Sequence, residues 1–354
     1  MPEISIFPAF FSIFYHFLPL KCLSKHRVVG YTKYCIQETE ISTIKVRIMT
    51  DHLELKAYGK INLGLDVVRK REDGYHEVRM IMQTVNLYDK IVMEKNGEGE
   101  IRTETNLPYV PDGEGNLAYR AAKLLADEFN IKDGVTIKIK KYIPVAAGMA
   151  GGSTDAAAVL VGMNRLFGLG LSKKELMERG VKLGADVPYC IMRGTALSEG
   201  IGEILTQLPP APQCHIVLAK PQVSVSTKTV YGKLRANELT PEQHPDIDGM
   251  RQAIEAGDLD GVIARLGNVL ETVTIPDHPE IGTIKKIMMA EGAEGALMSG
   301  SGPTVFGIFK EEETARQAYE TLKKADGGRL TRQVYLTRLF NQRKFVQMPL
   351  TAES

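Results

Sequence analysis

Residues 144–158 read PVAAGMAGGSTDAAA and are the most informative stretch of the sequence. Between positions 146 and 153 every residue except Met149 is glycine, alanine or serine. Such small residues let the backbone turn tightly and let a ligand approach it closely. We expect Gly151 and Gly152 in particular to need either this backbone freedom or a close approach to phosphate.

An alanine-rich helix should follow this loop, over about residues 154–167. Ser153 and Thr154 can cap its first turn. Free N–H groups at a helix start, together with the helix dipole, bind anionic phosphate, and the two hydroxyls can reach a Mg²⁺ ion carried by a nucleotide. A tight turn before a packed helix is the plainer alternative. The loop has neither the lysine of a Walker loop nor the G-x-G-x-x-G spacing of dinucleotide folds, so it predicts a phosphate site of another type.

Composition narrows the class of protein. The chain has 354 residues, 44% hydrophobic and 25% charged, which is typical of a globular protein with one large or two medium domains. A net charge of +1 provides no broad basic field for nucleic acid or an anionic membrane. The four cysteines form no C-x-x-C pair, so the pattern disfavours a disulfide framework or structural metal and fits a reducing cytoplasm.

Strand-like and helix-like segments are mixed along the rest of the chain. The apolar patterns predict strands at 53–68, 78–94, 135–142, 215–219, 295–298 and 305–309, and helices at 117–129, 225–236, 259–270, 280–290 and 313–324. Asn116 is a plausible N-cap, and Ser172 with Glu175 forms a capping box. Because strict βαβ alternation is lacking, the predicted fold class is α+β with mixed sheets.

The first 48 residues differ from the remainder. Five of the eleven phenylalanines lie there: Phe7, Phe10, Phe11, Phe14 and Phe17. The apolar run at 4–20 has no basic residues before it and holds two prolines. A start codon upstream of a true start at Met49 is therefore favoured over a signal peptide or membrane anchor, and a genuine ordered extension is the remaining alternative. The predicted division is a non-matching extension at 1–48 and domains at 49–206 and 207–354, the second beginning at a proline-rich stretch.

Several stretches resemble the GHMP kinase superfamily, which includes galactokinase and the homoserine and mevalonate kinases. The loop at 144–153 resembles its phosphate loop, KAYGKINL at 56–63 its N-terminal motif, and LMSGSGPT at 297–304 its C-terminal motif, which packs against the nucleotide loop. KINL at 60–63, DGYH at 73–76 and LGADVP at 183–188 are similar to the branch that phosphorylates a cytidine-diphosphate-linked polyol. The likeness covers about residues 53–340.

This resemblance implies a two-domain α+β GHMP kinase fold, with an N-terminal part like domain 2 of ribosomal protein S5 and a ferredoxin-like C-terminal part. It implies ATP as co-substrate, Mg²⁺ carried with ATP rather than held by a protein metal site, a small cytidine-diphosphate-linked polyol as substrate, no nucleic-acid or membrane partner, and a cytoplasmic location. The implied ATP-binding residues are Pro144, Val145, Ala146, Ala147, Gly148, Met149, Ala150, Gly151, Gly152, Ser153 and Thr154.

The resemblance also assigns catalytic roles. Asp186 would accept the proton of the substrate alcohol. Lys60 would polarise that alcohol, keep Asp186 ionised and stabilise charge on the transferring group. Asn62 would orient the alcohol. The structural alternatives are a turn residue for Asp186, a solvated strand lysine for Lys60 and a strand-end residue for Asn62.

Base recognition is implied for three further residues. Tyr75 can stack on a cytosine ring, His76 can hydrogen-bond the base edge, and Tyr231 occupies the place of a second aromatic. A hairpin turn with two surface rings, and a core aromatic at Tyr231, are the alternatives. Two other functions stay open: a homoserine or mevalonate type of kinase, and a GHMP-fold ligand sensor without turnover.

Overall fold

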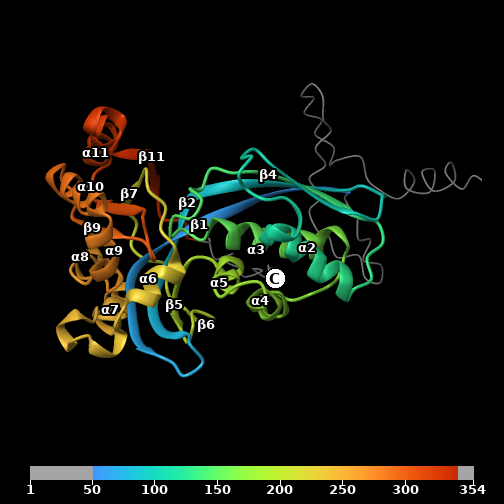
Figure 1. The fold of residues 1–354 in the computed structure, drawn as a ribbon, viewed down its shortest axis with the longest axis horizontal. Helices are drawn as coiled ribbons and strands as arrows, with labels where there is room; N and C mark the ends of the chain where they lie inside the picture. Colours follow the sequence, from blue (N-terminus) through green and yellow to red (C-terminus); the bar gives the residue numbers. More distant parts are fainter. Residues whose placement is uncertain (1–50, 342–354) are drawn as a thin grey trace, which may run out of the picture. The chain divides into compact units, whose positions relative to one another are not determined.

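Two β-sheets with helices packed on them form the part of the chain that the structure, a computed structural model, describes, which is residues 51–341 (Figure 1). The expectations for residues 1–48 lie outside this range. The first sheet has the strand order β3–β4–β2–β1–β8, and β5 pairs with both β2 and β6. Its strands are β1 (His52–Lys70), β2 (His76–Lys95), β3 (Ile101–Thr105), β4 (Val135–Lys140), β5 (Thr195–Glu199), β6 (Ile204–Gln207) and β8 (Gly267–Asn268).

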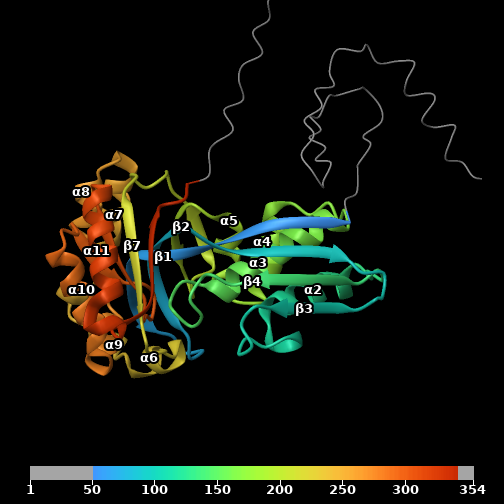
Figure 2. The ribbon, with the colours of Figure 1, turned by 90° about the horizontal axis from the view of Figure 1, so that it is seen from above.

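The second sheet has the order β11–β7–β10–β9. Its strands are β7 (His215–Pro221), β9 (Gly295–Met298), β10 (Val305–Phe309) and β11 (Thr331–Arg338). Neighbouring strands in it run antiparallel. Figure 2 shows this sheet beside the long β1–β2 pair, with helices covering its outer face. The α+β class and the two-part architecture predicted from the sequence are therefore present.

Helices cover one face of each sheet. Four lie with the first sheet: α2 (Leu117–Glu128), α3 (Gly151–Leu166), α4 (Lys173–Val181) and α5 (Val187–Met192). The others are α6 (Thr227–Lys233), α7 (Ile247–Ala256), α8 (Leu259–Ile263), α9 (Glu271–Asp277), α10 (Pro279–Ala290) and α11 (Glu312–Lys324). Helix α3 packs on β1 and β2, while α10 and α11 pack on the second sheet.

Local capping signals placed two helix starts correctly. The side chain of Asn116 accepts a hydrogen bond from the N–H of Ala118, and Ser172 with Glu175 forms the full capping box. The helix predicted at 259–270 is wrong beyond Ile263, because residues 267–268 pair in parallel with β1 instead. This pairing also joins a strand from the second half of the sequence to the first sheet. The predicted domain boundary between residues 206 and 207 stays a prediction.

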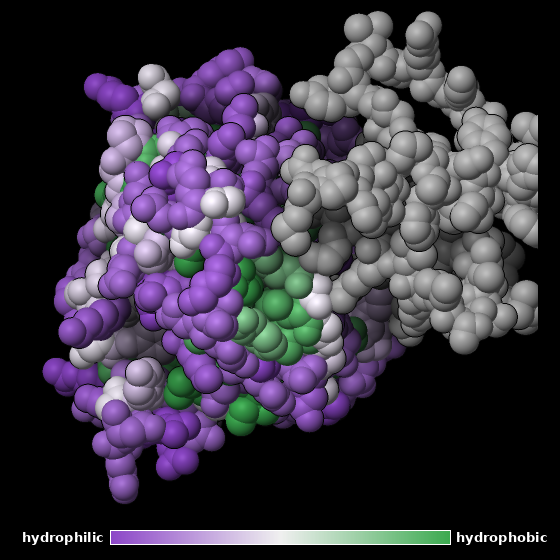
Figure 3. Space-filling view, turned by 90° about the vertical axis from the view of Figure 1, so that its right-hand side faces the viewer, coloured by the Kyte–Doolittle hydropathy of each residue, from purple (hydrophilic) through white to green (hydrophobic). Residues whose placement is uncertain are grey.

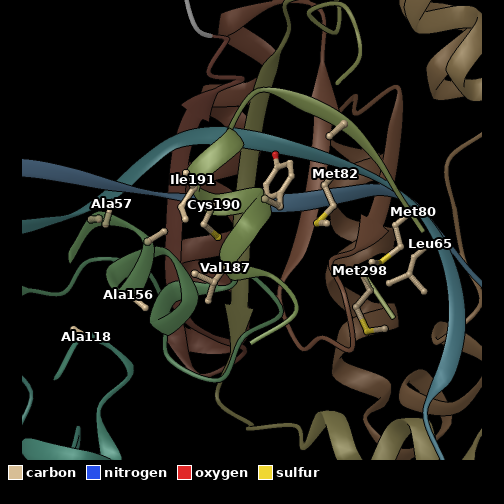
Figure 4. Close-up of a cluster of buried hydrophobic side chains, with 14 of the residues drawn as sticks. Ala57, Leu65, Met80, Met82, Ala118, Ala156, Val187, Cys190, Ile191 and Met298 are labelled. Carbon is tan, nitrogen blue, oxygen red and sulfur yellow. The ribbon is translucent and has the colours of Figure 1, made fainter. Parts of the chain in front are cut away.

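The β1 strand contributes side chains to two apolar cores, and an irregularity in its pairing between Asn62 and Gly64 lies where it passes from one core to the other. Ile61 and Leu63 face the second sheet, where they join one core with Phe306 and its neighbours. The other core lies under the helices of the first sheet and continues under α10 and α11 on the second sheet. Figure 4 shows part of it, with Cys190 and Ile191 of α5 on one side of the view and Met80 and Met82 of β2 on the other. Lys60 and Asn62 alternate with Ile61 and Leu63 and so point away from the second sheet.

A buried ion cluster, made of Asp89, Lys141 and Asp155, joins β2, the end of β4 and α3. The Lys141 Nζ lies 2.5 Å from Asp89 Oδ2 and 2.6 Å from Asp155 Oδ2. All three side chains are almost fully buried. Burial and the neighbouring Asp89 together raise the pKa of Asp155 to about 8, against the opposing effect of Lys141. Burial lowers the pKa of Lys141, but the two carboxylates more than offset this and the pKa is raised overall.

Most of the face drawn in Figure 3 is hydrophilic, with one apolar area near its centre. Between residues 51 and 341, none of the helices combines the length and the apolar character that crossing a membrane requires.

The ion cluster predicts how stability depends on pH. An unfolded Asp155 loses its proton near the ordinary aspartate pKa of 3.8, whereas the folded residue keeps its proton up to about pH 8. Between these values the folded state binds more protons, so the free energy of unfolding should fall as pH rises. Lys141 stays charged throughout this window because its pKa is raised. Asp155→Asn should remove this dependence.

The measurement is denaturant unfolding of wild type and Asp155→Asn at several pH values from 4 to 9. The variant should gain stability relative to wild type as pH rises. Asp133→Asn is the matched control, because Asp133 is exposed and forms no ion pair within the described residues. A constant difference between Asp155→Asn and wild type would show that Asp155 is ionised in the folded protein at neutral pH.

Candidate active site

The glycine-rich loop takes its shape from residues other than those expected. Ala146, Gly148 and Ala150 have positive φ values of 50°, 73° and 57°. Gly151 and Gly152 lie in the first turn of α3, and neither has a positive φ. These two glycines therefore do not need unusual backbone freedom, because the turn is completed before the helix starts, and their close approach to phosphate stays a prediction.

The two hydroxyl residues also lie differently from the sequence prediction. Helix α3 starts at Gly151 with Ala150 as its N-cap and no side-chain cap, so Ser153 and Thr154 are inside the helix. The Thr154 hydroxyl donates to the carbonyl oxygen of Tyr58 at 2.7 Å, and Thr154 is buried. Of the two, only Ser153 keeps a hydroxyl without a hydrogen-bond partner within the described residues.

Part of the predicted ATP loop is open to a ligand. Pro144, Ala147, Met149 and Thr154 are buried, and the remaining loop residues are half-buried or exposed: Val145, Ala146, Gly148, Ala150, Gly151, Gly152 and Ser153. The N–H groups of a helix's first turn have no intrahelical acceptor, and the dipole of the sixteen-residue α3 favours an anion there. This geometry is suited to phosphate groups.

A second glycine-rich turn, at residues 299–302, fixes the loop. The Ser299 hydroxyl donates to the carbonyl oxygen of Gly148 at 2.9 Å. The approach is so close that a Cβ on Gly148 would lie 2.0 Å from the Ser299 carbonyl oxygen. Asn268, which motif reasoning missed, donates from its Nδ2 to the carbonyls of Met298 and Gly300, at 2.8 Å each. A sequence motif could not indicate this role of Asn268, because the residue is placed beside the turn by the pairing of β8 with β1 in the tertiary structure.

Lys60 connects the loop to Asp186. Its Nζ donates to the Asn62 Oδ1 at 2.7 Å and to the carbonyl oxygen of Gly148 at 3.2 Å. The same Nζ lies 4.0 Å from the Asp186 Oδ2. Lys60 is 5% exposed, whereas the Asp186 side chain, at the N-cap position of α5, is 33% exposed and can meet a substrate. The structure therefore brings the two predicted catalytic residues together.

Asn62 is fully buried, which does not fit the expected contact with a substrate alcohol. Besides accepting from Lys60, it donates from Nδ2 to the Met80 sulfur at 3.4 Å. The Asn62 amide therefore holds the Lys60 ammonium in place through a hydrogen bond.

The three base-recognition candidates lie on the β1–β2 turn and on α6. The ring centroids of His76 and Tyr231 are 5.2 Å apart and tilted by 54°. The His76 Nε2 is buried and has no hydrogen-bond partner within residues 51–341. Burial lowers the pKa of His76, with a further contribution from Lys70, so the ring is neutral at pH 7. Tyr75 is 60% exposed and makes no ring contact with another described residue.

Comparison with known families defines the class of protein. Residues 116–194 match the family model of the GHMP kinases N terminal domain, and residues 250–327 match that of the GHMP kinases C terminal domain. The solved structure of a homoserine kinase from Cytophaga hutchinsonii shares the fold, with a TM-score of 0.70 at 20% identity over 85% of this chain and 98% of that one. The fold and the loop are those of the GHMP kinases.

Closer relatives narrow the family. A 4-diphosphocytidyl-2-C-methyl-D-erythritol kinase from Lachnoclostridium phytofermentans is 55% identical over 83% of this chain and 99% of its own length. One from Lachnospira eligens is 54% identical over 82% and 99%. A crystal structure of 4-(cytidine 5'-diphospho)-2C-methyl-D-erythritol kinase is similar at 33% identity, with a TM-score of 0.69, over 82% of this chain and all of that one. This chain belongs to the 4-diphosphocytidyl-2-C-methyl-D-erythritol kinase family.

Gly148→Ala should disturb the loop itself. The added Cβ would collide with the Ser299 carbonyl, and the positive φ would add strain of about 1–2 kcal/mol. We expect the KM for ATP to rise at least about tenfold, because a displacement of about 1 Å in a binding group can cost 10²-fold. Steady-state kinetics with ATP as the varied substrate measures this.

Gly170→Ala is the matched control, because Gly170 has a similar φ of 76° but open space around the position of a Cβ. It should lower stability by a similar strain and leave the KM for ATP unchanged. Equal KM values in both variants would mean that the contact between Gly148 and Ser299 does not shape the nucleotide site.

Proposed function

We propose that this chain transfers the γ-phosphoryl group of ATP to the 2-hydroxyl of 4-diphosphocytidyl-2-C-methyl-D-erythritol, in the non-mevalonate pathway to isoprenoid precursors. The observation that carries the proposal is the position of the Lys60 Nζ, which contacts the Gly148 carbonyl of the phosphate loop and lies 4.0 Å from Asp186. Relatives at 54–55% identity that carry this kinase name support the choice of substrate.

The chemistry assigns one task to each charged residue. Asp186 accepts the proton of the 2-hydroxyl while the oxygen of that hydroxyl attacks the γ-phosphorus of ATP. The bond from that phosphorus to the bridging oxygen breaks, and its electron pair leaves with ADP. Lys60 stabilises the negative charge that spreads over the transferring group. Asn62 positions Lys60 rather than the alcohol, since it is buried.

The first turn of α3 and the loop before it hold the phosphates of ATP. Among residues 51–341, no group of three or more His, Cys, Asp or Glu side chains is placed to hold a metal ion. We propose that Mg²⁺ arrives on the ATP phosphates and that the Ser153 hydroxyl contacts it. Bound there, the ion would neutralise phosphate charge.

The cytosine base is held at the other end of the site. The His76 Nε2 is buried and has no hydrogen-bond partner among residues 51–341, so it can bond the base edge once ligand binding exposes it. The His76 and Tyr231 rings, tilted by 54° to each other, line this end of the site. The exposed Tyr75 is free to stack on the base. A homoserine or mevalonate type of kinase has no base to place here, and a ligand sensor would not need Lys60 beside Asp186.

The function is tested by ADP release with a panel of acceptors. The diphosphocytidyl polyol should support turnover, and the same polyol without the cytidine diphosphate, homoserine and mevalonate should not. Turnover with homoserine or mevalonate would replace the proposed substrate, and binding of ATP without ADP release from any acceptor would favour the sensor.

Asp186→Asn separates chemistry from binding. The amide keeps the size of the carboxylate but cannot accept a proton, so kcat should fall about 10²–10⁴-fold with little change in substrate KM. Lys60→Ala should also lower kcat, and the double variant should lose less than the product of the two single losses, because the pair acts as a unit. A fall in kcat of less than about tenfold in folded, ATP-binding Asp186→Asn contradicts the role of general base.

Tyr75→Ala should weaken binding of the diphosphocytidyl substrate by about 1–3 kcal/mol, the usual scale of one base–aromatic stack. The KM for ATP should not change, because Tyr75 lies on the exposed β1–β2 turn. Tyr109→Ala is a control, since Tyr109 is equally exposed at 59% and lies in a different loop. Parallel weakening of both substrates by Tyr75→Ala would argue against base stacking.

A further inference from the structure

The ion cluster of Asp89, Lys141 and Asp155 connects the two ends of the phosphate loop. Lys141 directly follows β4, before the loop begins, and Asp155 lies in the second turn of α3, after the loop ends. One ammonium group therefore bridges the chain on both sides of residues 142–154. The third member, Asp89, belongs to β2 and ties both ends to the first sheet.

Asp89 also holds the backbone of the entry to the loop. Its Oδ1 accepts hydrogen bonds from the N–H of Tyr142 at 2.5 Å and from the N–H of Ile143 at 2.8 Å. The Lys141 ammonium lies directly beneath the start of α3, because a Cβ on Gly151 would be 3.2 Å from the Lys141 Nζ. The cluster thus contacts both the segment before the loop and the turn of helix that faces the nucleotide.

The loop needs such an external constraint. Two of its three positive φ values belong to alanines, which do not favour that conformation by themselves. A buried ion cluster is an expensive way to obtain stability, since well-packed apolar side chains often do as well or better. The Asp155 Oδ1 is buried without a hydrogen-bond partner among the described residues, which adds to this cost. A cluster at this position is better explained by the geometry that it fixes.

We propose that Asp89, Lys141 and Asp155 are positioning residues that set the separation of the two ends of the phosphate loop and thereby the affinity for ATP. The cluster acts through the loop backbone and touches neither substrate. This inference rests on the proposed binding of ATP at the loop, and its test is therefore direct binding of ATP, which needs no acceptor and no turnover.

The experiment compares Lys141→Met with Lys140→Met in the full chain. Lys140 is the neighbouring residue, is exposed and forms no ion pair with another described residue. We measure the Kd for ATP by calorimetry, the KM for each substrate, and the melting temperature. Lys141→Met should weaken ATP about 10–100-fold, since small displacements of binding groups have effects of this size. Lys140→Met should leave all of these quantities unchanged.

A second pair of variants keeps the test decisive if Lys141→Met does not fold. Asp155→Asn preserves the shape of the side chain and mimics its protonated form. Its Kd for ATP should therefore stay within about threefold of the wild-type value, which is well below the loss expected of a displaced loop. Asp155→Ala removes the contact and should weaken ATP at least about tenfold. The KM for the diphosphocytidyl substrate should stay near the wild-type value in each folded variant.

Three results would overturn the proposal. The first is an unchanged Kd for ATP in a folded Lys141→Met or Asp155→Ala protein. The second is an equal rise in the KM for both substrates, which indicates a general loss of structure. The third is failure of both variants to fold, which makes the cluster a stability element. Failure of the proposed function is a separate outcome, because wild type would then bind ATP without phosphorylating the diphosphocytidyl polyol, or would not bind ATP at all.

Discussion

The carbonyl oxygen of Gly148 accepts hydrogen bonds from the Lys60 ammonium and the Ser299 hydroxyl, and the rest of the site depends on this meeting point. Lys60 comes from the first sheet and Ser299 from the turn after β9 in the second. A single backbone oxygen therefore ties the glycine-rich loop to both sheets by hydrogen bonds. Because the Lys60 Nζ also lies 4.0 Å from Asp186, one side chain contacts both the loop and the proposed catalytic carboxylate.

The alternation of β1 makes this arrangement possible. Ile61 and Leu63 bury their side chains in the core between the sheets, which places Lys60 and Asn62 on the opposite face, toward the loop. The strand thus contributes to an apolar interface and a charged site at the same time. Asn62, with no exposed surface, shows how the burial of a polar residue is compensated: its amide is bonded to Lys60 and to the Met80 sulfur.

The site is asymmetric in its exposure. Beside the glycine-rich loop Lys60 is 5% exposed and the ion cluster beneath α3 is nearly closed to solvent, whereas the Asp186 side chain is 33% exposed. At the proposed base-binding end Tyr75 is exposed, while the His76 and Tyr231 rings already contact each other. Buried charges keep a fixed geometry because moving them costs desolvation energy, whereas an exposed ring can adjust to its ligand. Rigid chemistry at one end and adaptable recognition at the other suit a long substrate.

Features that depend on neighbouring residues could be predicted from the sequence. Small residues at 146–153 indicated a tightly turned loop, Asn116 and Ser172 indicated helix starts, and ordered motifs indicated the family. Only the tertiary structure decided which glycine is constrained, that Thr154 and Asn62 point inward, and that residues 267–268 form a strand. The ion cluster joins residues 52 and 14 positions apart in the sequence. Such contacts follow from strand register and packing, and a local pattern does not encode them because the partners belong to different elements.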